Sequence, residues 1–166
     1  RYIDELTVEI EYDEDGLQHM IMNGMDVTGD IRTQEISKKA SQVSAHAVVR
    51  DMLLDMQRDV AKVHNVIMDG RDIGTVVLPK ADVKIFLTAS PEVRAKRRTD
   101  ELEAKGQKAN YTQILKEIQE RDYQDTHREI APLKMARDSI KVDTSELDID
   151  GVVAAIRDIV AKKIPV

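Results

Sequence analysis

Short apolar runs that alternate with helical stretches constrain the fold of this chain more than any other feature. Residues 66–69, 83–88 and 140–142 are predicted as short buried strands. Helical periodicity covers 33–63, interrupted or continuous, and returns after Ser90-Pro91 toward Gly106, over 112–128 and over 149–163. This order predicts the α/β class, with a parallel sheet flanked by helices.

The opening third has a different pattern. Residues 6–12 alternate strictly between apolar and polar side chains, which predicts a half-buried strand. Turn signals at 13–16 and at Asn23-Gly24 enclose a returning strand at 17–22. We therefore expect a β-rich antiparallel insert at 1–32 in front of an α/β core at 33–166.

Composition narrows the function classes. The chain has 166 residues, the size of one domain, and 34% of them are charged, with a net charge of −6. An acidic chain is a poor binder of nucleic acid or of anionic membranes, so a phosphate site must be a local arginine cluster. Cysteine is absent, no apolar run is long enough to span a membrane, and the histidines lack metal-ligand spacing. We expect a cytoplasmic protein.

The segment VIMDGRDIGT, residues 66–75, is the strongest candidate for a binding site. Its apolar run ends in Asp69-Gly70-Arg71-Asp72, and ligands of open α/β sheets bind at the carboxyl ends of strands. Arg71 and Asp72 would suit a small molecule with a phosphate at one end and hydrogen-bonding groups at the other. The alternative is an Asp-Gly turn in which the two charges satisfy each other. We favour the binding site, because a buried strand has few structural reasons to end in two charges.

A second candidate is RDYQDTHR, residues 121–128. Arg121, Asp125 and Arg128 are spaced i, i+4 and i+7, which places them within roughly 60° on one helix face. A surface ion-pair ladder is the simpler interpretation, and the segment alone slightly favours it. However, Arg before Asp is the less favourable order for helix support, and two arginines beside one carboxylate can clamp a phosphate.

A third candidate is the helix after Pro91, which carries Arg94, Arg97 and Arg98. Taken alone, it is best explained as a charged helix face. The functional alternative is a mobile lid whose arginines neutralise a transferring phosphate.

Ser41 and Arg50 are nine residues apart, on opposite faces if the helix is continuous. They could converge on a ligand only if the helix breaks between Ser44 and Ala47, where no Pro or Gly forces a break. From the residues alone, both are better explained as ordinary surface positions.

Together these segments resemble the bacterial cytidylate kinase family, the nucleoside monophosphate kinases that phosphorylate CMP and dCMP. The matching pieces are SQVSAHAVVR, DGRDIGTVVLP, VKIFLTASPEVRAKRR, ERDYQDTHREIAPL and VDTSELDIDGV, in the family's order over most of 30–155. The resemblance implies a P-loop kinase fold, a β insert in the monophosphate-binding region and a lid at about 91–110.

The resemblance also implies roles for individual residues. Ser41, Arg50 and Asp72 would read the cytosine edge, Arg71 and Arg128 would bind the acceptor phosphate, and Arg121 and Asp125 would contact the pentose. Arg97 and Arg98 would act during transfer, together with Arg71 and Arg128. The implied substrates are CMP or dCMP and ATP, with Mg²⁺ arriving as MgATP, in an in-line phosphoryl transfer. We expect a monomer with no nucleic-acid or membrane partner.

One departure limits this interpretation. The sequence contains no Gly-x-x-x-x-Gly-Lys-[Ser/Thr] loop to cradle the donor phosphates. In the family this loop lies upstream of the insert, so we expect it, with the first strand and helix, to be missing before Arg1. The ATP phosphate site and the metal ligand would then also lie outside this chain, and we expect no phosphoryl transfer by the chain alone. A coupled ADP-release assay with CMP tests this, and robust turnover would refute it.

Two alternatives stay open at this point. The chain could be a non-catalytic nucleotide-binding module, which the presence or absence of an upstream phosphate loop would decide. It could also be a related kinase with another base preference, which binding of CMP, UMP and AMP to an Asp72→Ala variant would reveal.

Overall fold

The computed structural model describes residues 5–44 and 46–164, apart from the side chains of Gln34, Lys38 and Ser41. The chain divides into two compact units, Arg1–Gln57 and Arg58–Val166. The predicted insert, 1–32, lies in the first unit together with the helix that follows it and part of the next.

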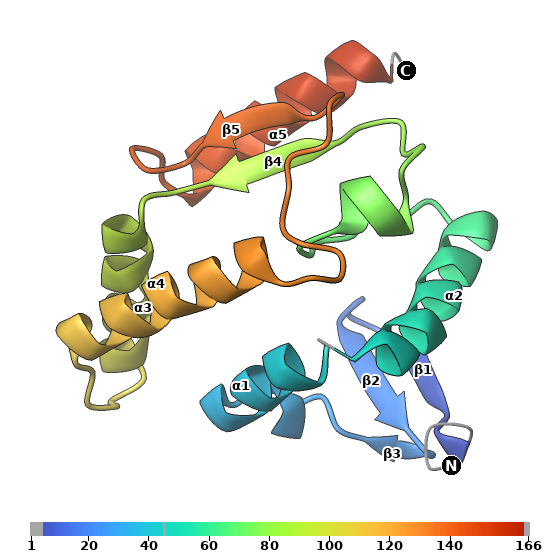
Figure 1. Cartoon of the computed structure of the whole chain (residues 1–166), viewed down its shortest axis with the longest axis horizontal. Coiled ribbons are helices and arrows are strands. Elements are labelled where there is room, and N and C mark those ends of the chain that lie inside the picture. The colour runs from blue at the N-terminus through green and yellow to red at the C-terminus, as the bar shows by residue number, and fades with distance from the viewer. Residues whose placement is uncertain (1–4, 45, 165–166) are drawn as a thin grey trace. The chain divides into compact units, whose positions relative to one another are not determined.

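The first unit contains a three-stranded antiparallel sheet in the order β1-β2-β3 (Figure 1). Its strands are β1 (Val8–Tyr12), β2 (Gln18–Met22) and β3 (Met25–Asp26). Asn23 and Gly24 have φ values of 50° and 77°, the left-handed pair that a tight hairpin turn requires. The predicted antiparallel sheet and both turns are therefore confirmed.

The predicted half-burial of the first strand is wrong. Ile10 and Tyr12 on the apolar side of β1 are 43% and 68% exposed. No described residue of this unit is buried, because a sheet of three short strands offers too little second layer to cover either face.

The helical stretch after the insert is interrupted. α1 (Gln34–Val43) is capped by the Thr33 hydroxyl, and α2 begins at Ala47 and ends at Val63. The short η2 (Asp30–Arg32) precedes α1. The Arg50 side chain donates from Nη1 to the Ser44 carbonyl oxygen at 3.2 Å. An arginine therefore satisfies a backbone carbonyl at the break, without any Pro or Gly.

The second unit contains the predicted parallel pairing. β4 (Ile85–Thr88) pairs with β5 (Ile140–Asp143), with Ile85 opposite Ile140 (Figure 1). The end of α2 belongs to this unit, followed by η3 (Ile73–Val77), α3 (Pro91–Ala104), α4 (Tyr111–His127) and α5 (Ile149–Lys163). The α/β class is confirmed, and the predicted helices agree with α3, α4 and α5.

Local capping explains why these helices start where they do. Ser90, Asn110 and Asp148 each accept a hydrogen bond from the backbone N–H three residues later, at 3.2, 3.1 and 2.8 Å. α3 and α4 then pack together through a small apolar core. Its members are Ala95, Leu102 and Ile114, with Ala109, Leu115 and Ile118 around them. Ala95 is 0% exposed, so its small side chain lets the two helices approach closely.

The predicted strand at 66–69 is wrong. These residues follow α2 without forming a strand, and the described sheet of this unit has two strands, β4 and β5. A strand needs a neighbour for its backbone hydrogen bonds, and an apolar run alone does not supply one. Ile67 is consequently 103% exposed.

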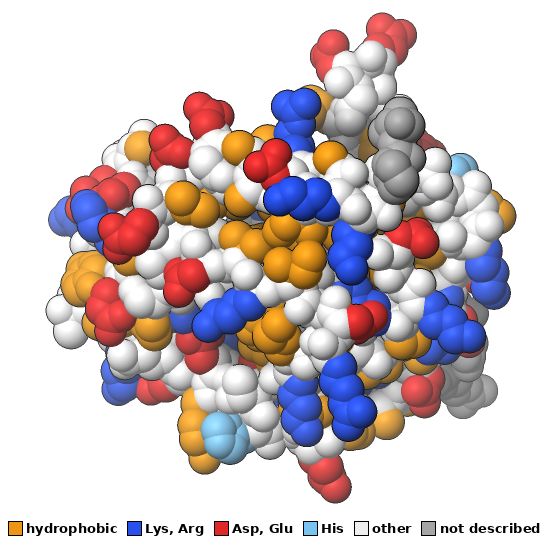
Figure 2. Space-filling model, turned by 90° about the horizontal axis from the view of Figure 1, so that it is seen from above, with side chains coloured by type: hydrophobic (Ala, Val, Ile, Leu, Met, Phe, Trp, Pro, Cys, Tyr) orange, Lys and Arg blue, Asp and Glu red, His pale blue; other side chains and the backbone are white. Residues whose placement is uncertain are grey.

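The surface carries charges of both signs. Figure 2 shows acidic and basic side chains interspersed with apolar ones on the face that it draws. Within the described ranges, no helix has the length and apolar character to cross a bilayer.

Candidate functional site

The segment Gly70–Val77 positions Asp72 at the start of η3. The Asp72 carbonyl oxygen accepts hydrogen bonds from the N–H groups of Thr75, Val76 and Val77 at 3.2, 2.8 and 3.3 Å. The carboxylate makes no capping bond, and the residue is only 9% exposed. A Cβ at Gly70 would lie 2.9 Å from Cγ1 of Ile73, so glycine lets Ile73 pack closely beside the segment. The backbone thus fixes Asp72 and leaves its carboxylate for other contacts.

Arg58, which the sequence analysis missed, holds the other end of η3. Its Nε donates to the Val77 carbonyl at 3.1 Å and its Nη2 to the Val76 carbonyl at 2.9 Å. The side chain therefore satisfies carbonyls at the end of the helix that Asp72 begins. Local spacing gave no signal for this contact, because the partners are 18 and 19 residues away.

Five charged side chains of the second unit gather at one place, and we call them the charged cluster: Arg71, Asp72, Arg121, Asp125 and Arg128. Arg71 Nε donates to Asp125 Oδ2 at 2.8 Å, and Arg121 Nε lies 3.9 Å from the same oxygen. Arg128 Nη2 lies 3.8 Å from Asp72 Oδ1. The structure thereby brings together the two strongest candidate segments of the sequence.

Burial within the charged cluster is uneven. The side chains of Asp125, Asp72 and Arg128 are 8%, 11% and 15% exposed, whereas those of Arg71 and Arg121 are 44% and 50% exposed. Three guanidinium groups meet two carboxylates, so the cluster has an excess of positive charge. Carboxylates held at depth with arginines reaching the surface form an arrangement suited to a ligand that carries both an anion and hydrogen-bond donors.

Arg128 reaches the charged cluster differently from the sequence prediction. α4 ends at His127, and Arg128 has an extended backbone with ψ of 143°, so it does not share a helix face with Arg121 and Asp125. Its Nε donates to the Ala131 carbonyl at 2.7 Å. Ala131 has φ of 46°, an uncommon conformation for alanine, directly before Pro132. Proline disfavours the right-handed helical conformation in the residue before it, so this dipeptide was the available signal that the helix ends early.

The three arginines of α3 have different partners. Arg97 donates to the carbonyl oxygens of Thr144 and Leu147, which follow β5, at 2.5 and 2.9 Å. Arg98 pairs with Glu101 of its own helix at 2.8 Å. The predicted lid at about 91–110 corresponds to α3 and the loop after it, and its role stays a prediction. A transfer role for Arg97 requires it to exchange these carbonyls for phosphate oxygens.

Arg94 joins α3 to α4. Its Nη1 and Nη2 donate to the two carboxylate oxygens of Asp122 at 2.9 and 2.5 Å, and its Nε donates to the Ala89 carbonyl at 3.1 Å. The hydrogen bond to Asp122 raises the pKa of the Arg94 guanidinium. Sequence spacing did not predict this pair, because its members are 28 residues apart.

Ser41 and Arg50 belong to the first unit, on α1 and α2. The break between Ser44 and Ala47, which their convergence on a ligand requires, is present. The Ser41 side chain lies outside the described residues. Their role in reading the base therefore stays a prediction.

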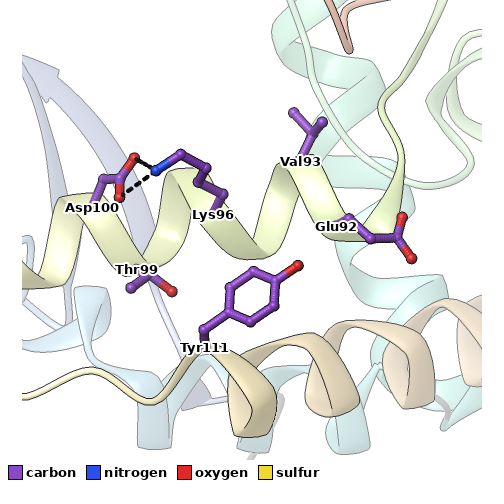
Figure 3. A pocket seen from close by; sticks show the side chains of 6 residues that line it. All are labelled: Glu92, Val93, Lys96, Thr99, Asp100 and Tyr111. Atoms are coloured by element: carbon purple, nitrogen blue, oxygen red, sulfur yellow. Dashed lines mark hydrogen bonds and ion pairs between the residues drawn. The ribbon is translucent and has the colours of Figure 1, made fainter.

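A separate open groove of about 450 Å³ lies between α3 and the start of α4 (Figure 3). Its lining residues are Glu92, Val93, Lys96, Thr99, Asp100 and Tyr111. Tyr111 points toward α3, and Lys96 Nζ donates to Asp100 Oδ2 at 3.1 Å. No predicted site residue lines this groove. Among the described side chains, no group of three or more His, Asp or Glu is arranged to hold a metal ion.

The chain is similar to known proteins of one family. A family model described as Cytidylate kinase matches residues 2–162. The chain is 52% identical to a cytidylate kinase of Lactobacillus johnsonii over 161 residues, which are 97% of this chain and 70% of the relative. It is 46% identical to one of Carboxydothermus hydrogenoformans over 163 residues, 98% of this chain and 73% of the relative. A cytidylate kinase of Clostridium botulinum is 49% identical over 144 residues, 87% of this chain and 66% of the relative.

Proposed function

The chain belongs to the cytidylate kinase family of phosphotransferases, and we propose that the charged cluster is its acceptor site. There CMP or dCMP receives the γ-phosphoryl group of ATP. The observation that carries this proposal is the pairing of Arg71 with the nearly buried Asp125 at 2.8 Å, across 54 residues of sequence. This contact brings an arginine suited to a phosphate beside carboxylates suited to a nucleoside.

We assign the acceptor phosphate to Arg71 and Arg128. Arg71 meets Asp125 through Nε, and the same guanidinium carries two Nη groups that can donate to phosphate oxygens. Arg128 is held by the Ala131 carbonyl through Nε, which orients its guanidinium group. Fixing the plane of each guanidinium lowers the entropy lost when a phosphate binds.

We assign the base to Asp72 and the pentose to Asp125 and Arg121. An ionised carboxylate only accepts hydrogen bonds. Asp72 would therefore accept from the exocyclic amino group of cytosine and repel the carbonyl that uracil has at that place. For Ser41 and Arg50, a role in reading the base stays a prediction that rests on the resemblance alone. Asp125 would accept from a pentose hydroxyl, which explains why a second buried carboxylate belongs to the cluster.

The transfer itself asks for positioning and charge neutralisation rather than covalent help. MgATP is the second substrate, its γ-phosphoryl group passes to an oxygen of the CMP phosphate, and ADP and CDP are the products. Arg97 and Arg98 are the proposed contacts to the charge that develops during transfer. The acidic, mixed-charge surface supports action as a cytoplasmic monomer without nucleic-acid or membrane partners.

An Asp72→Ala variant tests the proposed base contact. We expect its CMP dissociation constant to rise by about 10- to 150-fold, because a hydrogen bond to a charged group contributes about 1.5–3 kcal/mol. The UMP affinity should stay the same or rise, because the carboxylate that repels the uracil carbonyl is gone. The AMP affinity should change little, since adenine does not offer the cytosine amino group in that place. Isothermal titration calorimetry with each of the three nucleotides measures the ratio of the dissociation constants of the variant and the unmodified protein.

The matched control is Asp100→Ala, which removes an exposed carboxylate whose described partner is Lys96 of the same helix. It should leave all three affinities unchanged. If Asp72→Ala weakens UMP and AMP as much as CMP, Asp72 does not read the base. If the unmodified protein prefers none of the three, the charged cluster is not a cytidylate site.

A further inference from the structure

The ion pair between Arg94 and Asp122 lies beyond Ile118, the last described member of the apolar core on α4. The shared core of these helices involves the first part of α4, through Ile114, Leu115 and Ile118. Asp122 follows Ile118 by four residues and Ile114 by eight, so it continues the same stripe toward the end of α4. About 12 Å of helix separates Ile114 from Asp122. The ion pair, rather than apolar packing, therefore attaches the second half of α4 to α3.

The geometry of the pair suits orientation as well as attachment. Both Nη groups of Arg94 meet Asp122, and Nε meets the carbonyl of Ala89, the residue after β4. A bidentate pair fixes both distance and angle, unlike a single contact between point charges. One side chain thus ties α4 to α3 and to the carboxyl end of β4.

Asp122 places the Arg94–Asp122 ion pair next to residues of the charged cluster on α4. Asp122 follows Arg121 directly and lies three residues before Asp125, within one helical turn. A slide or rotation of this turn would displace Asp125 from Arg71 Nε, 2.8 Å away. The described partners of the Arg94 side chain are Asp122 and Ala89, so we expect its effect on the proposed phosphate site to pass through α4.

We propose that Arg94 and Asp122 are a positioning pair that sets the place of Asp125, and through it the guanidinium of Arg71, for acceptor binding. This proposal rests on the proposed function, because CMP is the ligand whose affinity it predicts. The proposal gives Arg94 a positioning role. Of the three arginines on α3, Arg98 is then best placed to exchange its partner for phosphate, because that partner is the exposed Glu101 of the same helix.

The test is a set of variants measured by calorimetry with CMP and by NMR of the Arg71 Nε–H group. Asp122→Asn and Arg94→Met should each weaken CMP binding by about 2- to 30-fold, and the double variant no more than either one. Each should also shift the Arg71 Nε–H resonance without ligand. In an Asp125→Asn background, Asp122→Asn should have no further effect on CMP affinity, which a general loss of stability would not reproduce. Arg94→Lys keeps the positive charge but not the two Nη donors of the guanidinium. Its CMP affinity should lie between those of Arg94→Met and the unmodified protein.

Lys96→Met and Asp100→Asn are the controls, because they break an ion pair that joins two residues of α3. They should change neither readout, and circular dichroism should show all variants folded. CMP affinity and an Arg71 resonance that are unchanged in Asp122→Asn would overturn the positioning role, as would additive losses in the double variant. If the unmodified protein does not bind CMP, the proposed function fails. The Arg71 resonance then decides the positioning role independently.

Discussion

Replacing Asp125 with asparagine should weaken CMP binding by about 10- to 150-fold and lower the stability of the folded chain. Asp125 is 6% exposed, and its Oδ2 accepts from Arg71 and lies near Arg121. Asparagine keeps the shape but removes the charge, so Arg71 loses its partner and a pentose hydroxyl loses a strong acceptor. Hydrogen bonds to charged groups contribute about 1.5–3 kcal/mol, which gives this range of affinity.

The stability effect of Asp125→Asn should be smaller than for a fully buried pair. Breaking such a pair costs about 3–5 kcal/mol, but the Arg71 side chain is 44% exposed and solvent screens part of its charge. We expect a loss of about 1–2 kcal/mol in the free energy of unfolding, measured by urea denaturation.

Glu120→Gln is the matched control for Asp125→Asn. It neutralises an exposed carboxylate on the same helix, 3.8 Å from Lys116, and should leave CMP affinity and stability unchanged. If the Asp125→Asn protein is folded and has the CMP affinity of the unmodified chain, Asp125 does not belong to the proposed site.

Local signals determined how much of the fold could be predicted. The start of α3 was readable because Ser90 satisfies a backbone N–H group of its own helix. The Asn23-Gly24 turn was readable because it needs two left-handed residues. The strand at 66–69 failed, since an apolar run does not specify the partner that makes it a strand. The placement of Arg128 on the face of α4 was wrong, because the helical spacing was followed one residue past the end of the helix, although Ala131-Pro132 lay just beyond.

The same limit on local signals applies to the residues of the candidate site. Arg71 and Asp72 were selected because two charges stood at a predicted strand end. Arg121, Asp125 and Arg128 were assigned to the site through the family resemblance, since their segment alone slightly favoured a surface ion-pair ladder. The structure gathers all five. Arg58, Arg94 and Asp122 were missed or given other roles, because each acts on a partner 18 or more residues away. Such contacts leave no periodicity in the sequence.

Removing the proposed phosphate contacts should reduce the difference in affinity between CMP and cytidine. It should not weaken the binding of both ligands equally. We expect Arg71→Met and Arg128→Met each to weaken CMP by about 10- to 150-fold, the equivalent of 1.5–3 kcal/mol for a charge-assisted contact. Cytidine, which lacks the phosphate, should lose much less. The ratio of the two dissociation constants, measured by calorimetry, separates a phosphate contact from a general disturbance of the site.

The pH dependence supplies an independent test of the same two arginines. A phosphate monoester loses its second proton near pH 6, so CMP gains negative charge between pH 5 and 7 while both guanidinium groups stay charged. CMP affinity should therefore rise with pH in the unmodified protein and rise less in Arg71→Met and Arg128→Met. Cytidine affinity should be flat over this phosphate transition. Lys62→Met is the control, because it removes an exposed cation paired with Asp59 within α2 and should keep the full pH dependence. An equally steep rise for CMP in both arginine variants would show that these residues do not bind the acceptor phosphate.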